Sequence, residues 1–187
     1  MKIKNRNLIK SSDLIILDRH YSEVFDILMK NKKPETEIIF DPSTEISSRT
    51  IKILKKVNYP ILPWEAIKIL GKDFRSGVKK LMRIIKKPYI LTCGKFGSVL
   101  IDKKIKFFNS YKGKIVNSNG AGDFFRGAFA YGILNKFDLE SNLDWSNYVS
   151  AFCLERNLKF SKNEIKKRVL KKNNFSLKDV VENFRKI

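Results

Sequence analysis

The hydrophobic and polar positions of this chain alternate between two periods along most of its length. Short apolar runs bounded by polar residues predict buried strands at 13–18, 36–42, 59–62, 89–92, 98–101 and 104–108. Apolar residues at helical spacing predict helices at 21–31, 47–57, 64–70, 73–87, 123–135 and about 142–157. Asp102 and Lys103 separate the last two strands, which are therefore expected to form a hairpin.

Strands that alternate with helices predict βαβ units, and thus an α/β fold with a mainly parallel sheet and helices on both faces. In such sheets ligands bind at the turns that follow the carboxyl ends of the strands. At 187 residues, the simplest organisation is a single domain, 1–187, that ends in a basic helical tail at 158–187. Ser176 and Asp179 have the spacing of a capping box for a final helix.

Small residues concentrate at one turn between a polar loop and an apolar run. Positions 120–132 hold four of the nine glycines and three of the five alanines. At a helix N-terminus, small residues let an anion approach the unpaired backbone N–H groups. Close packing with Asp123 as a helix N-cap is an equally good explanation from spacing alone. Arg126 is expected on a solvated face of that helix.

The net charge of +20 admits a nucleic-acid partner, because a dense cationic face gains from counterion release. The lysines are scattered, however, and 30 Lys against 9 Arg follow what an A/T-rich genome would encode. Solvated faces are therefore the favoured explanation, and nucleic-acid binding is the weaker alternative. The absence of a long apolar run or a secretory signal, with two distant cysteines, predicts a cytoplasmic protein without a membrane span.

Several segments together resemble the PfkB/ribokinase-like carbohydrate kinases. NSNGAGDFFRGAF, at 117–129, resembles the family signature D-T-x-G-A-G-D-x-F-x-G-A-F. LTCGKFGSVLI, at 91–101, resembles its T-x-G-x-x-G segment, and Glu65-Ala66 and FDPS (40–43) resemble two earlier stretches. Order and spacing agree over about 13–157. The resemblance implies the C-terminal portion of a ribokinase-like fold, with the N-terminal part missing.

The resemblance also implies a reaction, the ATP-dependent phosphorylation of a sugar hydroxyl. Asp123 corresponds to the base that deprotonates the acceptor hydroxyl. Gly120, Ala121 and Gly122 correspond to the anion hole whose amides stabilise the transferring phosphoryl group.

Four further positions carry roles implied by the same resemblance. Thr92, Gly94 and Gly97 correspond to the nucleotide-binding side of the site. Glu65 corresponds to an acidic residue that helps to organise Mg²⁺, through water. ATP and Mg²⁺ are therefore the expected cosubstrate and cofactor, and a small sugar is the expected acceptor.

Two substitutions and the length of the chain depart from the family pattern. Asn117 replaces the usual Asp at a monovalent-cation site, so activation by potassium is not expected, and Leu62 replaces the usual Asn near the metal. Without the N-terminal strands, an open sheet edge is expected to recruit another chain. We therefore expect a homo-oligomer or a separately encoded N-terminal half as partner, with an inactive kinase remnant or binding module as the alternative function.

Overall fold

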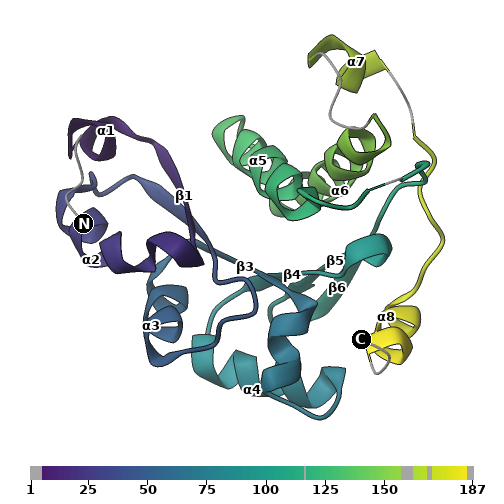
Figure 1. Cartoon of the computed structure of the whole chain (residues 1–187), viewed down its shortest axis with the longest axis horizontal. Coiled ribbons are helices and arrows are strands. Elements are labelled where there is room, and N and C mark those ends of the chain that lie inside the picture. The colour runs from purple at the N-terminus through teal and green to yellow at the C-terminus, as the bar shows by residue number, and fades with distance from the viewer. Residues whose placement is uncertain (1–5, 116, 157–161, 168–169, 185–187) are drawn as a thin grey trace. The chain divides into compact units, whose positions relative to one another are not determined.

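The structure is a computed structural model that describes residues 6–115, 117–156, 162–167 and 170–184 (Figure 1). Its residues divide into two compact units, 1–90 and 91–187, which are described one at a time. Strand β4 (Tyr89–Thr92) lies at the boundary in sequence. The organisation of 1–187 as one domain stays a prediction. Within the described residues, no helix is long and apolar enough to cross a membrane.

Three parallel strands form the sheet of the first unit, in the order β1-β2-β3. They are β1 (Leu14–Asp18), β2 (Glu37–Asp41) and β3 (Tyr59–Pro63). The register pairs Leu14 with Glu37 and Ile39 with Tyr59. All three predicted strands and their parallel pairing are confirmed.

Helices and 3₁₀ turns connect these strands. They are α1 (Arg6–Ser11), η1 (Arg19–Val24), α2 (Phe25–Asn31), α3 (Ser48–Lys56), η2 (Trp64–Ile69) and α4 (Phe74–Ile85). Capping boxes at Ser47 and Asp73 satisfy the first amides of α3 and α4, which fixes where both begin. The helix predicted at 21–31 starts instead as a 3₁₀ turn, because the Asp18 carboxylate accepts the His20 amide at 2.9 Å. Helix α1 was not predicted.

Strand β1 is less buried than its apolar sequence predicts. Leu17 is 4% exposed, whereas Ile16 is 47% exposed. The neighbouring Ile39 and Phe40 of β2 are fully buried. Among the described residues, β2 is the one strand partner of β1 in its unit, so β1 is an edge strand. The prediction of burial on both faces is wrong for Ile16, because the described residues of this unit leave about half of it exposed.

The second unit contains an antiparallel hairpin of β5 (Gly97–Ile101) and β6 (Ile105–Asn109), as predicted. Its helices are η3 (Gly94–Phe96), α5 (Ala121–Leu134), α6 (Leu139–Glu155), α7 (Lys162–Lys167) and α8 (Leu177–Phe184). The capping box before α8 is confirmed, since the Ser176 amide donates to Asp179 Oδ2 at 2.7 Å. The predicted helical tail is confirmed at 162–167 and 177–184, whereas 170–176 is not helical. Residues 158–161, 168–169 and 185–187 lie outside the described residues.

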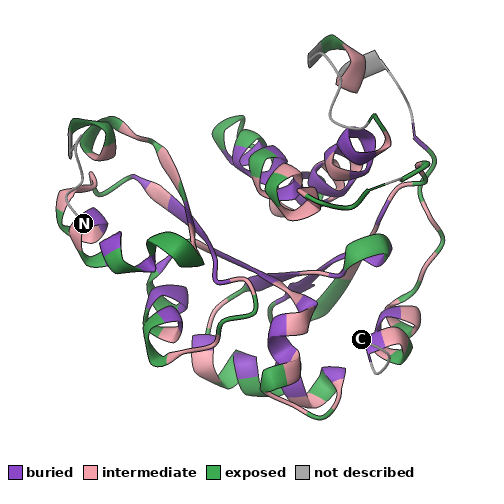
Figure 2. Ribbon diagram, viewed as in Figure 1, coloured by how far each residue is buried: buried purple, intermediate pink, exposed green. Residues whose placement is uncertain are grey.

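Helices α5 and α6 pack side by side, with α6 against β5 and β6 (Figure 1). Figure 2 shows their buried positions on facing sides. A Cβ at Gly132 would stand 1.9 Å from Asn142 Oδ1, so glycine is needed for this close approach. The Asn142 side chain, itself fully buried, donates to the Phe129 carbonyl at 2.9 Å. Close packing therefore explains this one of the four clustered glycines.

Candidate functional site

Helix α5 begins directly after the polar loop, at Ala121 rather than at the predicted residue 123. Gly120 is the N-cap, with φ +81° and no side-chain hydrogen bond, and this left-handed conformation suits glycine. The Ala121 amide donates to the Ser118 carbonyl at 3.2 Å. Helix geometry leaves the next two amides, of Gly122 and Asp123, without an acceptor inside α5. They are the donors that an anion at this terminus would meet first.

Asp123 is the third residue of α5, so the alternative that it is the N-cap is wrong. Its carboxylate forms an ion pair with the Arg126 guanidinium one turn further along the helix. The Asp123 side chain is 76% exposed and that of Arg126 only 17%. A Cβ at Gly122 would lie 3.3 Å from Arg126 Nη1. The Arg126 side chain therefore packs against the glycine turn and pairs with the Asp123 carboxylate. The prediction that Arg126 faces solvent is wrong.

The segment that follows β4 forms a tight turn into β5. The Cys93 amide donates to the Gly97 carbonyl at 2.7 Å, which closes the turn around η3. Gly97 has φ +116°, and a Cβ there would stand 2.2 Å from the Phe108 carbonyl oxygen. Gly94 has φ +54° and faces open space. Gly97 is thus required by backbone geometry, whereas Gly94 has a left-handed φ that glycine favours and leaves room in front of the turn.

One pocket of about 450 Å³ brings together two of the predicted segments. Its lining includes five predicted site residues: Thr92, Gly94, Gly97, Ala121 and Gly122. Gly120 and Asp123 flank the last two in sequence and are not themselves part of the lining. The two glycine-containing motifs, more than twenty residues apart, therefore face a common space beside the N-terminus of α5.

Polar contacts from α6 hold the start of α5 beside the β5–β6 hairpin. Ser150 Oγ donates to the Ala121 carbonyl at 3.0 Å. Asn147 Nδ2 donates to Ser98 Oγ at 2.9 Å and to the Phe108 carbonyl at 3.2 Å. Ser150 and Asn147 also line the pocket. These contacts preorganise the turn, because they tie the first residue of α5 to a buried helix.

Much of the pocket lining was not predicted from the sequence. The missed polar and aromatic residues include Lys95, Ser110, Tyr111, Asn147, Asn173 and Phe175. Asn147 lies in a predicted helix and Ser110 in a predicted loop, and neither carries a motif. Only contacts between distant segments bring these side chains to the pocket.

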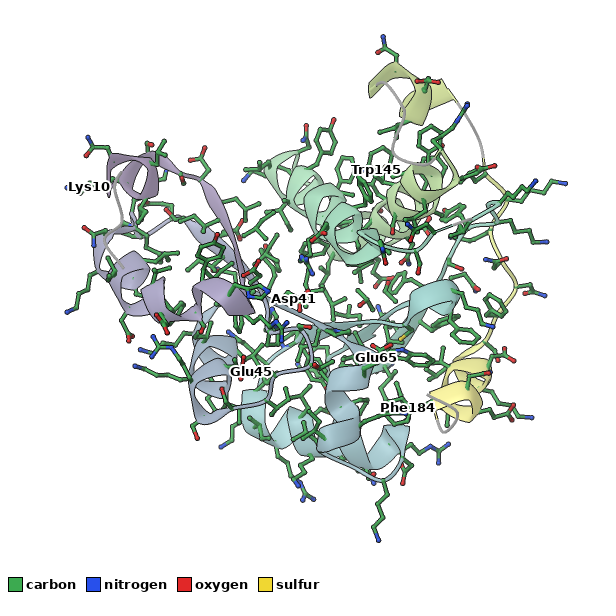
Figure 3. All side chains as sticks on the ribbon, in the orientation of Figure 1. Lys10, Asp41, Glu45, Glu65, Trp145 and Phe184 are labelled. Carbon is green, nitrogen blue, oxygen red and sulfur yellow. The ribbon has the colours of Figure 1, made fainter. Side chains whose placement is uncertain are left out.

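Glu65 belongs to the first unit, where it lies in η2 and is partly buried (labelled in Figure 3). Its Oε1 accepts a hydrogen bond from the indole N–H of Trp64 at 2.8 Å. Leu62, at the position where the family pattern has Asn, is fully buried and offers no ligand atom. The described residues include no group of three or more His, Cys, Asp or Glu side chains that could hold a metal.

Asn117 takes part in the loop before α5. Its Oδ1 accepts the Asn119 amide at 2.9 Å, and the residue is exposed. This local turn uses the side-chain oxygen that an aspartate would offer to a cation.

Comparison with known proteins places the chain in a family. The model of the pfkB family carbohydrate kinases matches residues 16–163. The chain is 28% identical over 154 residues to an ATP-dependent 6-phosphofructokinase of Thermoanaerobacterium thermosaccharolyticum. That match includes 80% of this chain and 47% of the relative, so the chain spans about half the length of the relative.

Solved structures show the same fold. A ribokinase of Thermotoga maritima aligns with a TM-score of 0.64 at 20% identity, over 99% of this chain and 60% of its own. An Arabidopsis thaliana ribokinase complexed with ribose and ATP aligns with a TM-score of 0.66 at 16% identity, over 99% and 60%. The predicted α/β, ribokinase-like fold class is therefore confirmed.

Proposed function

Because this chain belongs to the pfkB family of carbohydrate kinases, we propose that it carries the nucleotide-binding and catalytic portion of an ATP-dependent sugar kinase. One observation carries the proposal: residues of both glycine motifs line a single pocket at the N-terminus of α5. A helix N-terminus attracts phosphate groups through its free amides and its dipole. The pocket volume of about 450 Å³ is within the range of small-molecule sites.

In the proposed reaction, Asp123 accepts the proton of the sugar hydroxyl while the hydroxyl oxygen attacks the γ-phosphorus of ATP. The bond from that phosphorus to the bridging oxygen breaks, and ADP leaves with the electron pair. The amides at the start of α5 stabilise the charge on the transferring group. The exposed Asp123 carboxylate can be reached by an acceptor once Arg126 shifts from its ion pair.

Mg²⁺ would come with the nucleotide, since it binds through phosphate oxygens and retained water more often than through a protein cage. We propose Glu65 as its indirect contact, on the resemblance alone. One Glu65 oxygen accepts from Trp64, which would hold the carboxylate in a fixed orientation. Glu65 is the one carboxylate that we propose as a contact of the ion.

The edge of β1 supports a partner. Its outer N–H and C=O groups have no strand neighbour among the described residues of its unit, and Ile16 is 47% exposed. An apolar edge of this kind recruits another strand. We propose that this added strand comes from a second copy of the chain or from a separately encoded N-terminal half, which would also supply the sugar contacts. We further propose a cytoplasmic location. Sedimentation should show an oligomer or complex; a stable, active monomer would contradict this.

The test is Asp123→Asn, which removes the proton acceptor and keeps the size of the side chain. Loss of a positioned base costs about 10²–10⁴-fold in rate, so phosphotransfer should fall by that amount. Affinity for ATP should change little, because the base acts on the acceptor. Phosphotransfer at the wild-type rate by the variant would rule out this role.

The second candidate is a binding module that holds a nucleotide without turnover. The Asp123–Arg126 ion pair favours it, because a carboxylate engaged by a guanidinium is less available as a base. Wild-type protein that binds ATP but phosphorylates none of a panel of sugars, with its partner present, would support this candidate.

A further inference from the structure

A segment near the C-terminus, 170–175, lies beyond the region that the family model matches. Its backbone is joined to the stretch that follows β6. The Lys112 amide donates to the Lys171 carbonyl at 2.7 Å, and Tyr111 and Lys172 form an antiparallel bridge. The Asn173 amide donates to the Ser110 carbonyl at 2.9 Å. We call 170–175 the clasp.

Side chains strengthen this attachment at one end of the clasp. Asn109 binds the backbone of Phe175 twice: its Nδ2 donates to the Phe175 carbonyl at 2.9 Å, and its Oδ1 accepts the Phe175 amide at 2.8 Å. Asn173 Nδ2 donates to Ser110 Oγ at 2.7 Å. The Phe175 ring meets Phe96 edge to face, with centroids 5.0 Å apart.

An ionic cluster anchors the other end. Lys172 Nζ lies 2.6 Å from Asp144 Oδ1 and 5.6 Å from the centroid of the Tyr111 ring. The Tyr111 hydroxyl donates to Asp144 Oδ2 at 2.8 Å. Burial, and then this hydrogen bond, raise the pKa of the Tyr111 hydroxyl above its ordinary value. The clasp is thus fixed by α6 as well as by the hairpin.

Two clasp side chains, Asn173 and Phe175, line the candidate nucleotide pocket, whereas Asn109 and Asn174 do not. We propose that the clasp builds the wall of this pocket that receives the nucleotide base. Phe175 and Asn173 then determine affinity for the base, and Asn109 is a positioning residue that acts through Phe175. The proposal rests on the proposed function of the pocket as a nucleotide site.

The chemistry of the two sides of the pocket separates base from phosphate. Ala121 and Gly122 offer a helix terminus, which suits phosphate. Phe175 and Asn173 offer an aromatic face and an amide, and bases are held by stacking and by hydrogen bonds to their edges. Lys171 and Lys172 of the clasp are not part of the lining, and Phe175 and Asn173 carry no charge, so these two side chains have little to offer a phosphate.

The experiment measures binding of ATP and of inorganic tripolyphosphate to the full chain, by calorimetry, for wild type, Phe175→Ala, Asn173→Ala and Asn109→Ala. Asn174→Ala is the matched control, since Asn174 is exposed and outside the pocket. Loss of a buried aromatic contact predicts about 10- to 100-fold weaker ATP binding by Phe175→Ala. Asn173→Ala and Asn109→Ala should each weaken ATP binding by about fivefold or more, the worth of a hydrogen bond. Tripolyphosphate binding should be unchanged throughout.

A double mutant tests the positioning role. If Asn109 acts through Phe175, adding Asn109→Ala to Phe175→Ala should weaken ATP binding no further. Additive losses would overturn that role. ATP binding by Phe175→Ala and Asn173→Ala equal to wild type would overturn the clasp proposal, as would equal losses for tripolyphosphate. Wild-type protein that binds neither probe would instead contradict the proposed function. If a thermal melt shows that Phe175→Ala is not folded, the ATP affinity of Asn173→Ala compared with that of Asn174→Ala decides whether the clasp proposal holds.

Discussion

Replacing Gly97 by alanine should be far more damaging than the same change at Gly94, three residues earlier. Both residues have positive φ, at +116° and +54°. The Gly97 conformation is open almost only to glycine, and holding another residue there costs about 1–3 kcal/mol. The new Cβ would also stand 2.2 Å from the Phe108 carbonyl oxygen and 2.6 Å from the Ser110 nitrogen.

Both of these atoms are backbone, so relief requires β6 to move away from β5. Each hydrogen bond lost in that movement adds about 1 kcal/mol. The sum for Gly97→Ala is about 3–5 kcal/mol, which for a chain of this size lowers Tm by roughly 6–20 °C. Gly94→Ala meets no atom within 4 Å and should cost only about 1–2 kcal/mol for its left-handed backbone.

Urea unfolding followed by circular dichroism measures both variants against wild type, with equal m values as the check that the unfolded states are comparable. The expected result is a loss greater by about 1–4 kcal/mol for Gly97→Ala than for Gly94→Ala. Equal losses, or a greater loss for Gly94→Ala, would refute the account of the turn between β4 and β5.

Three further predictions concern packing, pH and charge. Gly132→Ala should destabilise the protein by about 1–3 kcal/mol through the clash with Asn142. Gly127→Ala, with no atom within 4 Å of the new Cβ, should instead stabilise it by about 0.5–1 kcal/mol. Urea unfolding compares the two variants, and a stabilising Gly132→Ala would contradict the packing of α5 against α6. Burial raises the pKa of Tyr59, Tyr89 and Tyr111, so the unfolded chain releases these protons first. The free energy of unfolding should therefore fall as pH rises above about 10, and unchanged stability in that range would contradict the burial of these hydroxyls. If the charge of +20 reflects coding bias, the protein should bind duplex DNA with a Kd of about 10⁻⁴–10⁻⁶ M or weaker at physiological salt. A fluorescence titration measures this Kd, and nanomolar binding would favour the nucleic-acid alternative.

The periodicity of apolar residues and the spacing of the motifs were enough to predict most of the helices and strands. β4 was predicted at 89–92 and lies there, and the hairpin follows from two apolar runs that only Asp102 and Lys103 separate. The start of α5 was predicted two residues late, because the positive φ of Gly120 sets it and a glycine alone does not reveal its φ. Apolar sequence also overstated the burial of Ile16, since burial depends on a neighbouring element and not on the strand itself.

Part of the candidate site was predicted from the sequence and part was not. The glycine motifs were identified because both segments resemble those of a known family, and because small residues concentrate at 120–132. The side of the pocket formed by Asn173 and Phe175 was not, since its hydrogen bonds join residues more than sixty positions apart and follow no period. The ion pair of Asp123 with Arg126 has an ordinary helical spacing, which occurs on solvated faces as well.

The central claim is that the pocket at the N-terminus of α5 binds ATP. The most direct measurement is the change in amide chemical shifts of ¹⁵N-labelled protein during titration with ATP and Mg²⁺. The account predicts saturable shifts at Gly94, Gly97 and Gly122, with tripolyphosphate shifting Gly122 as well. Shifts confined to lysine-rich surface helices, with these three amides unmoved at saturating ATP, would contradict it.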